Sequence, residues 1–269
     1  MGLMAGSWRA IRRFTQMLWH AIKGVHLARN GFNQLDAQAQ QRAVERWARE
    51  FLEAAGIALR IEGQPVAHGP VLLVANHQSW LDIPTLHAAR HCRFISKAEI
   101  SRWPLVGALA RAAGTLFVQR NSRRDTQRTV LAMAQALEHG DILTVFPEGT
   151  VGPGRELLPF HGNMLQAAID VDVAVQPVAM TFVDQRTGAI SYVPCEAYPD
   201  EPMLRSLWRT IGTEHLMAVV HYGVPEKANG RDRRQWANDL RAQVQALRWN
   251  AASEPELEQD LPLEQATVR

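Results

Sequence analysis

The chain has 269 residues, of which 46% are hydrophobic, and its 29 basic and 27 acidic side chains give a formal net charge of +2. This composition excludes a disordered chain, because enough apolar surface is available to fill one or two cores. Cys92 and Cys195 are too few for a disulfide scaffold and lack the spacing of a zinc ribbon, which favours a reducing compartment. The near-neutral charge argues against a nucleic-acid partner.

The N-terminal segment carries five basic side chains and no acid within residues 1–30. Between residues 5 and 28, large apolar side chains recur at steps of three and four, which places them on one helical stripe. They are Trp8, Ile11, Phe14, Leu18, Ile22 and Val25, with Arg9, Arg12, Arg13, Gln16 and Lys23 on the other side. Such a helix suits either a membrane interface or packing on its own domain, and the pattern leaves both open.

The chain shows no uninterrupted apolar run of the roughly 18–20 residues that a transmembrane helix needs. Charges also interrupt the apolar core that a signal peptide would require in the N-terminal segment. We therefore expect attachment to a membrane surface through residues 5–28, with the basic side chains close to anionic lipid.

From residue 57 onward, short apolar runs alternate with helical stretches. This alternation predicts an α/β fold with a mixed, largely parallel sheet flanked by helices and preceded by the amphipathic segment. Strands are predicted at 57–62, 70–75, 92–96, 115–118, 142–146, 173–180 and 217–222, and helices at 35–55, 80–90, 103–113, 124–139, 162–170, 201–212 and 231–249. We divide the chain into a helical membrane-associating segment (1–56), an α/β domain (57–250) and an acidic mobile tail (251–269).

The segment NHQSWLD, residues 76–82, follows a predicted buried strand, where open α/β sheets place their sites. His77 and Asp82 would lie about 140° apart on a regular helix, so they meet only if His77 lies in the turn and Asp82 in the first helical turns. Asp82 would then orient the imidazole and raise its basicity, which makes His77 a candidate general base. The alternative is a histidine that caps the helix beside an acid near its N-terminus.

Two further strand ends carry polar groups. The segment GTLFVQR, residues 114–120, ends in Arg120, whose planar guanidinium suits a phosphate. The arginines that follow it, Arg123, Arg124 and Arg128, are interpreted as surface side chains of a helix N-terminus. The segment FPEGT, residues 146–150, places Glu148 in a turn, where it either serves a ligand or accepts hydrogen bonds from the backbone.

His87 and His91 are four residues apart and could contact one metal ion, but no third ligand lies at a usual spacing. A surface or semi-buried histidine pair is therefore favoured, and no metal site is predicted. His161 is expected to pack near the FPEGT segment. The chain has no Gly-x-Ser-x-Gly sequence, which weighs against a serine hydrolase of the α/β type.

Taken in order, the His-x4-Asp, GTLFVQR and FPEGT segments resemble the glycerolipid acyltransferase family, and most of all the bacterial 1-acylglycerol-3-phosphate acyltransferases. A fourth element of that family, an apolar strand that carries a proline, is matched by VQPV at residues 175–178. The resemblance covers about residues 57 to 225. Each block alone is weak, but four blocks in the family's order and spacing are highly specific.

The resemblance implies an O-acyltransferase that moves a fatty acyl group from acyl-CoA or acyl carrier protein to the free sn-2 hydroxyl of 1-acylglycerol-3-phosphate. The product would be phosphatidic acid, made for phospholipid biosynthesis at the cytoplasmic face of the inner membrane. His77, assisted by Asp82, would take the proton of the hydroxyl, whose oxygen then attacks the thioester. Because a thioester carries a good leaving group, neither a nucleophilic side chain nor a cofactor is needed.

By the same resemblance, Arg120 would contact the phosphate of the acceptor. Glu148 and Gly149 would bind its glycerol part, and Thr150 belongs to the same substrate-binding group. Lys97, at the end of a predicted strand, lies where the family often has a basic residue.

One position departs from the family's pattern. The third block commonly continues with arginine after threonine, but this chain has Val151, and Arg155 is a possible substitute across a glycine-rich turn. An acceptor with less negative charge, such as a lyso-ornithine lipid or another lysophospholipid, is therefore an alternative. A non-catalytic peripheral membrane module and a hydrolase that uses the same site with water are lesser alternatives.

Overall fold

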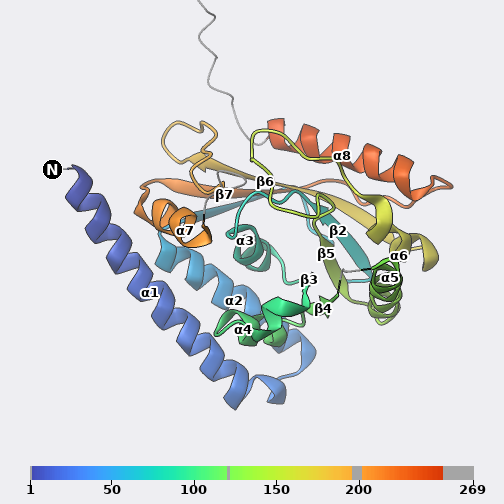
Figure 1. Ribbon diagram of the computed structural model, residues 1–269, viewed down its shortest axis with the longest axis horizontal. Helices are drawn as coiled ribbons and strands as arrows, with labels where there is room; N and C mark the ends of the chain where they lie inside the picture. The colour runs from blue at the N-terminus through green and yellow to red at the C-terminus, as the bar shows by residue number, and fades with distance from the viewer. Residues whose placement is uncertain (1, 120–121, 196–201, 251–269) are drawn as a thin grey trace, which may run out of the picture.

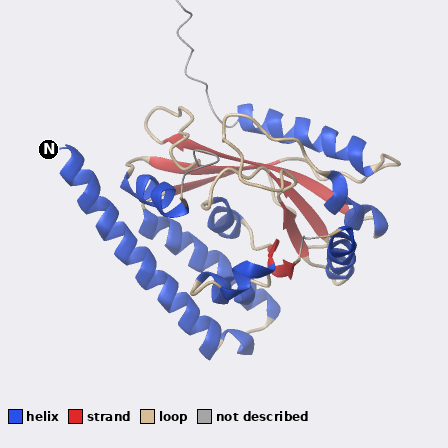
Figure 2. Ribbon diagram, viewed as in Figure 1, coloured by secondary structure: helices blue, strands red, loops and turns tan. Residues whose placement is uncertain are grey.

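The computed structural model describes residues 2–119, 122–195 and 202–250, and within them a seven-stranded sheet carries helices on both faces (Figures 1 and 2). The strands are β1 (Ala58–Glu62), β2 (Val71–Ala75), β3 (Arg93–Lys97), β4 (Leu116–Val118), β5 (Ile142–Val145), β6 (Ala174–Asp184) and β7 (Leu216–Tyr222). Their order is β1-β7-β6-β2-β5-β3-β4, and β6 and β7 are the antiparallel pair among otherwise parallel neighbours. The predicted mixed, largely parallel sheet is confirmed, with a strand at every expected place.

The α-helices are α1 (Gly2–Asn30), α2 (Ala37–Ala55), α3 (Asp82–Ala89), α4 (Val106–Ala112), α5 (Arg123–Glu138), α6 (Leu165–Asp170), α7 (Met203–Gly212) and α8 (Arg233–Asn250). Short 3-10 helices lie at Phe32–Gln34, Ala98–Arg102 and Gly162–Met164. The helix predicted at 103–113 begins three residues late, because Trp103 still closes the preceding 3-10 turn and Leu105 has a positive φ of 60°. The segment 162–170 likewise starts as a 3-10 turn.

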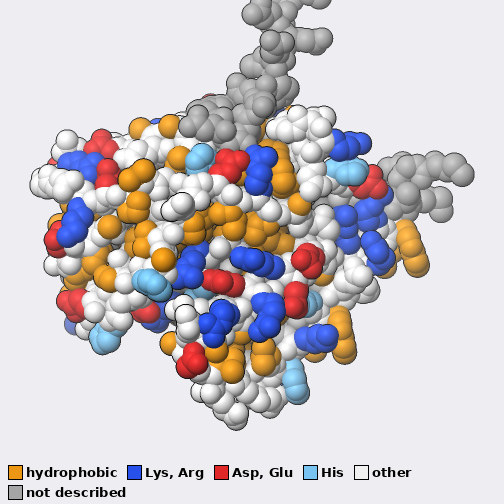
Figure 3. All heavy atoms as spheres, turned by 180° about the vertical axis from the view of Figure 1, so that it is seen from behind, with side chains coloured by type: hydrophobic (Ala, Val, Ile, Leu, Met, Phe, Trp, Pro, Cys, Tyr) orange, Lys and Arg blue, Asp and Glu red, His pale blue; other side chains and the backbone are white. Residues whose placement is uncertain are grey.

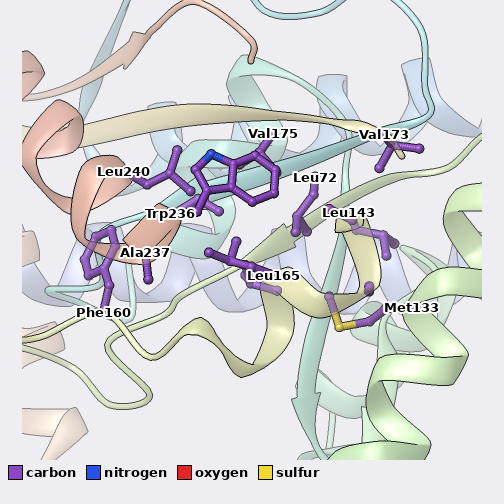
Figure 4. Packing of buried hydrophobic residues seen from close by; sticks show 14 of the residues in the cluster. Leu72, Met133, Leu143, Phe160, Leu165, Val173, Val175, Trp236, Ala237 and Leu240 are labelled. Carbon is purple, nitrogen blue, oxygen red and sulfur yellow. The ribbon is translucent and has the colours of Figure 1, made fainter. Parts of the chain in front are cut away.

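The central strand β2 is buried on both faces, and its side chains alternate between two cores. Leu72 and Val74 point into a cluster with α5, α6 and α8, and Leu73 points into one with α3. Figure 4 shows the first cluster, in which Trp236 of α8 lies beside Val175 of β6. The two cores hold the sheet between its helix layers, so the strand ends are rigidly placed.

The N-terminal helices share a core with the α/β elements. Ala10 and Met17 of α1 are buried with residues of α2, α7 and the sheet. Arg13 donates from Nη1 to the carbonyl oxygens of Ile211 (3.0 Å) and Thr213 (2.5 Å) at the end of α7. Such carbonyls lack helical partners and attract positive charge, so this contact anchors α1 to the body of the protein.

The large apolar side chains of α1 are mostly left on the surface. Trp8 is 71% exposed, and Ile11, Phe14, Leu18, Trp19 and Ile22 are exposed as well. Val25 differs from the rest of the predicted stripe because it is buried. The helix therefore packs through a narrow side that includes Ala10 and Met17 and keeps most of its apolar stripe outward. No helix among the described residues has the length and apolar character needed to cross a membrane.

Candidate active site

The turn after β2 is fixed to β6 by side-chain hydrogen bonds to a single residue. Ala75 pairs with Val178 at the end of the parallel ladder. Beyond this point the side chain of Asn76 replaces the backbone ladder: its Oδ1 accepts from the Met180 amide (2.7 Å) and its Nδ2 donates to the Met180 carbonyl (3.1 Å). The Gln78 side chain donates to the same carbonyl (2.9 Å). The chain is thereby forced to turn at His77, between these two anchors.

His77 and Asp82 meet in the way that the sequence requires. The distance between His77 Nδ1 and Asp82 Oδ2 is 2.7 Å, with His77 in the turn and Asp82 as the first residue of α3. Asp82 Oδ2 also accepts from the backbone amides of Gln78 (2.7 Å) and Ser79 (2.9 Å), and the side chain is fully buried. The acid therefore shapes the turn and orients the imidazole at once.

The contact to Asp82 settles which imidazole nitrogen is available for chemistry. The ionised Asp82 carboxylate can only accept a hydrogen bond, so His77 Nδ1 carries the proton of that bond and His77 Nε2 is left as an acceptor. The His77 side chain is 18% exposed, so the ring is partly open to solvent. Phe146 stacks on the ring at 4.2 Å between centroids and limits its rotation. An oriented imidazole beside a buried carboxylate is equipped to accept a proton.

Glu148 joins the third predicted segment to the histidine turn. Its Oε1 accepts from the His77 amide (2.7 Å) and its Oε2 accepts from the Leu158 amide (2.8 Å). The Gly152 amide completes the connection by donating to the His77 carbonyl (2.7 Å). Burial raises the pKa of Glu148, and the two amide hydrogen bonds oppose that rise. The acid thus accepts backbone hydrogen bonds, as one of the two sequence interpretations expected.

Around Glu148 the backbone needs glycine at two points. Gly149 has a φ of +75°, and a Cβ on Gly152 would lie 2.9 Å from Glu148 Oε2. Gly149 and Thr150 are exposed at the tip of this turn. His161 lies beside them, as expected, because its amide donates to the Pro147 carbonyl (2.8 Å). The turn therefore presents exposed backbone next to the histidine.

The predicted basic residues fall into three groups. Lys97 is the exposed last residue of β3 and pairs in register with Val118 of β4. Arg120 lies outside the described residues. The arginines of α5, namely Arg123, Arg124 and Arg128, are exposed at the helix N-terminus, as expected. Figure 3 shows one face of the molecule, on which basic and acidic side chains are interspersed.

Three further residues lie around the site, and of these the sequence pointed to Arg155 alone. Arg248 of α8 is buried and donates from Nη2 to the Gly154 carbonyl. The buried Cys195 thiol lies 3.8 Å from Gln78 Oε1. Arg155, the suggested substitute for an arginine at position 151, places its guanidinium 4.5 Å from the centre of the Tyr192 ring. An arginine in the last turn of a helix is common, so the sequence held no signal for Arg248.

The histidine pair lies behind the site. His87 and His91 stack at 5.7 Å, and His87 also meets the edge of Phe94, which stacks in turn on Phe146. Burial lowers the pKa of His87 to about 3 and that of His91 to about 4. Both rings are therefore neutral near pH 7 and serve as packing for the aromatic groups behind the turn.

Comparisons with known proteins agree with the motifs. Residues 58–181 match the family model described as Acyltransferase. The chain is 34% identical over 214 residues to the lyso-ornithine lipid O-acyltransferase of Pseudomonas aeruginosa, covering 80% of this chain and 81% of that protein. It is 35% identical over 213 residues to the 1-acyl-sn-glycerol-3-phosphate acyltransferase of Neisseria meningitidis, covering 78% and 82%. The chain therefore belongs to the acyltransferase family, and the family resemblance seen in its sequence is confirmed.

Within that family the chain is an enzyme of the lysophospholipid acyltransferase type, which acts in lipid biosynthesis. Its fold is shared with the crystal structure of the 1-acyl-sn-glycerophosphate acyltransferase PlsC from Thermotoga maritima. That structure has a TM-score of 0.60, covers 89% of this chain and 97% of its own, and is 20% identical in sequence.

Proposed function

We propose that the protein transfers a fatty acyl group from acyl-CoA or acyl carrier protein to the free sn-2 hydroxyl of 1-acylglycerol-3-phosphate, giving phosphatidic acid. The observation that carries the proposal is the His77–Asp82 pair, held at 2.7 Å in a turn that is anchored on two strands. A relative that this chain matches over 82% of the relative's length is named for this acceptor.

The chemistry follows from the free nitrogen of the imidazole. His77 Nε2 takes the proton of the acceptor hydroxyl while that oxygen forms a bond to the thioester carbonyl carbon. The tetrahedral intermediate then expels the thiolate, which receives the proton back from His77. Asp82 stabilises the imidazolium that exists between these steps, because its buried carboxylate lies on Nδ1. A placed base of this kind contributes roughly 10²–10⁴-fold in rate.

The acceptor would bind over the exposed tip of the third segment. Gly149 and Thr150 offer exposed backbone beside the imidazole, and Glu148 fixes their position from below. Each carboxylate oxygen of Glu148 keeps a lone pair for a glycerol hydroxyl after its hydrogen bond to the backbone. Lys97 and Arg120 would meet the phosphate, because Lys97 ends β3 and Arg120 comes after the neighbouring strand β4 in the sequence.

A second acceptor class remains a candidate because of Val151. A phosphomonoester carries up to two negative charges, and the third segment supplies no cation at that position. Another relative is named for lyso-ornithine lipid. In this version the reaction and the roles of His77 and Asp82 are unchanged, and only the headgroup contacts differ.

Attachment to a membrane would use α1 and α7 together. The exposed apolar side chains of α1 continue onto α7, where Phe14 meets Trp208 with ring centroids 6.2 Å apart. Aromatic and aliphatic side chains of this kind suit the headgroup region of a bilayer. Arg9 and Arg13 bind the end of α7 instead of facing lipid, which leaves the exposed Arg12 and two further basic residues of α1 for anionic headgroups. We place the enzyme on the cytoplasmic face of the inner membrane.

A donor-by-acceptor matrix tests the function. Purified protein is given acyl-CoA or acyl carrier protein together with 1-acylglycerol-3-phosphate, lyso-ornithine lipid or a neutral lysophospholipid in mixed micelles. We expect the fastest transfer to 1-acylglycerol-3-phosphate. A preference for lyso-ornithine lipid would replace the acceptor, and release of free fatty acid without any acceptor would indicate a hydrolase. Firm binding to vesicles without transfer to any acceptor would leave a non-catalytic membrane module.

A further inference from the structure

Arg248 is a buried charge that the fold does not fully pair. Its side chain is 5% exposed, and of its donors Nη2 reaches the Gly154 carbonyl. Within the described part of the chain, the buried Nε and Nη1 have no hydrogen-bond acceptor. A buried guanidinium with unfilled donors is destabilising compared with an apolar side chain of similar size. Its presence therefore calls for a reason other than stability.

The surroundings of Arg248 are those of the active site. The Gly154 carbonyl that it binds lies in the loop between Glu148 and Leu158, whose amide holds the Glu148 carboxylate. A Cβ on Gly154 would lie 3.5 Å from Gln78 Oε1, in the turn that His77 begins. The C-terminal helix α8 thus reaches the loop that carries the third segment (Figure 1).

The charged and titratable groups that face Arg248 come from three elements. Glu148 follows β5 and Asp82 begins α3, while Tyr192 and Cys195 belong to the segment after β6. Burial lowers the pKa of Arg248 and these groups oppose that effect, so the guanidinium stays charged. Asp82 Oδ1 is itself buried and has no hydrogen-bond partner among the described residues. The site therefore contains a buried positive charge and a buried carboxylate oxygen, each without a full set of hydrogen-bond partners among the described residues.

We propose that Arg248 is a positioning residue for acyl transfer, which places a buried positive charge against the loop at residues 152–158 and holds that loop against the histidine turn. The inference rests on the proposed function, since it assigns a role within the same site. It also gives the site a cation behind the third segment, where Val151 supplies none.

The helix offers a matched control. Arg241 lies seven residues before Arg248, on the same side of α8, and donates to the carbonyls of Leu158 (3.0 Å) and Leu157 (2.6 Å). It therefore ties down the same loop by the same kind of bond. The two arginines differ in burial, since Arg241 is half-buried whereas Arg248 is buried. A purely structural role would make Arg248→Met and Arg241→Met behave alike.

The test compares the pH profiles of kcat/KM for wild type, Arg248→Met, Arg248→Lys and Arg241→Met. Removal of a positive charge favours the protonated form of every neighbouring group, so the acid limb of Arg248→Met should move upward by about one pH unit. Arg248→Lys should keep the acid limb of the wild type. Arg241→Met should lower the activity without a shift. Arg248→Gln provides a second uncharged variant in case Arg248→Met does not fold.

The possible results separate cleanly. An acid limb that is unchanged in both uncharged variants, or equally moved in Arg241→Met, would overturn the role of Arg248 and leave the proposed function intact. A wild-type protein without acyl transfer to any acceptor would overturn the proposed function, and the role of Arg248 would fall with it.

Discussion

The buried carboxylate of Asp82 provides the sharpest test of how the turn works. Asp82→Asn keeps the size of the side chain and one carbonyl oxygen, which can still accept from the amides of Gln78 and Ser79. It removes the charge that orients His77 and stabilises its protonated form. The substitution therefore separates the electrostatic role of the acid from its role in shaping the turn.

The loss of stability can be bounded from the same contacts. A hydrogen bond to a charged group is worth about 1 kcal/mol more than a neutral one, so two amide bonds lose about 2 kcal/mol together. The new amide nitrogen would occupy the place of Oδ1, which is buried without a partner, and an unpaired buried donor costs about 1–3 kcal/mol. A total of about 3–5 kcal/mol lowers Tm by roughly 10 °C. The variant should remain folded at 25 °C.

The loss of activity should be far larger than this change in stability can explain. Without the carboxylate, His77 is a weaker and less well-oriented base, so kcat/KM should fall by about 10²–10⁴-fold. Acyl transfer is measured by thin-layer separation of the lipid product, and circular dichroism checks that the variant is folded. A folded Asp82→Asn protein with kcat/KM within about threefold of wild type would refute the assigned role.

Three further predictions concern the packing around the site. Because burial holds the pKa of His87 at about 3, the unfolded chain binds more protons than the folded protein below pH 6.5. Lowering the pH from 7 to 5 should therefore reduce the free energy of unfolding of wild type by about 2 kcal/mol more than that of His87→Leu, as measured by urea unfolding. Equal losses in the two proteins would contradict this. Gly154→Ala and Gly188→Ala both place alanine at a positive φ, but only the Cβ of Gly154→Ala would clash with another residue, at 2.3 Å from Cys195 Sγ. Tm should therefore fall by several degrees more for Gly154→Ala than for Gly188→Ala. Similar decreases in Tm would argue against the close contact. Burial raises the pKa of Cys92 and of Cys195 to about 12. Iodoacetamide at pH 8 should therefore modify neither thiol in the native protein, and should modify both when the protein is unfolded in urea. Rapid labelling of either thiol in the native protein would contradict this.

The layered fold and the histidine turn could be predicted because their signals are local. Short apolar runs mark buried strands, and an apolar strand followed by the polar residues Asn76 and His77 marks a strand-to-helix turn. The parallel order of the neighbouring strands then brings the His77 turn and Glu148 to the same edge of the sheet. Each short block is a weak signal alone, and it is the order of the blocks along the chain that made the site predictable.

Other features depend on contacts between distant parts of the chain. Arg248 reaches Gly154 across 94 positions, and nothing near it in the sequence distinguishes it from a surface arginine. In the same way, the basic character of α1 indicated lipid contact for all its arginines, whereas Arg9 and Arg13 bind the end of α7. A pattern along one helix shows what its faces are made of, but the partner of each face is set by the tertiary fold.

The most direct test of the account is the rate of acyl transfer by His77→Ala, measured beside His139→Ala as a control. His139 ends α5 and is exposed, far along the chain from the histidine turn. With a saturating acyl thioester and lysolipid acceptor, we predict that His77→Ala loses about 10²–10⁴-fold in kcat and that His139→Ala retains wild-type activity. A folded His77→Ala protein that transfers acyl groups at the wild-type rate would contradict the central claim that His77 is the base.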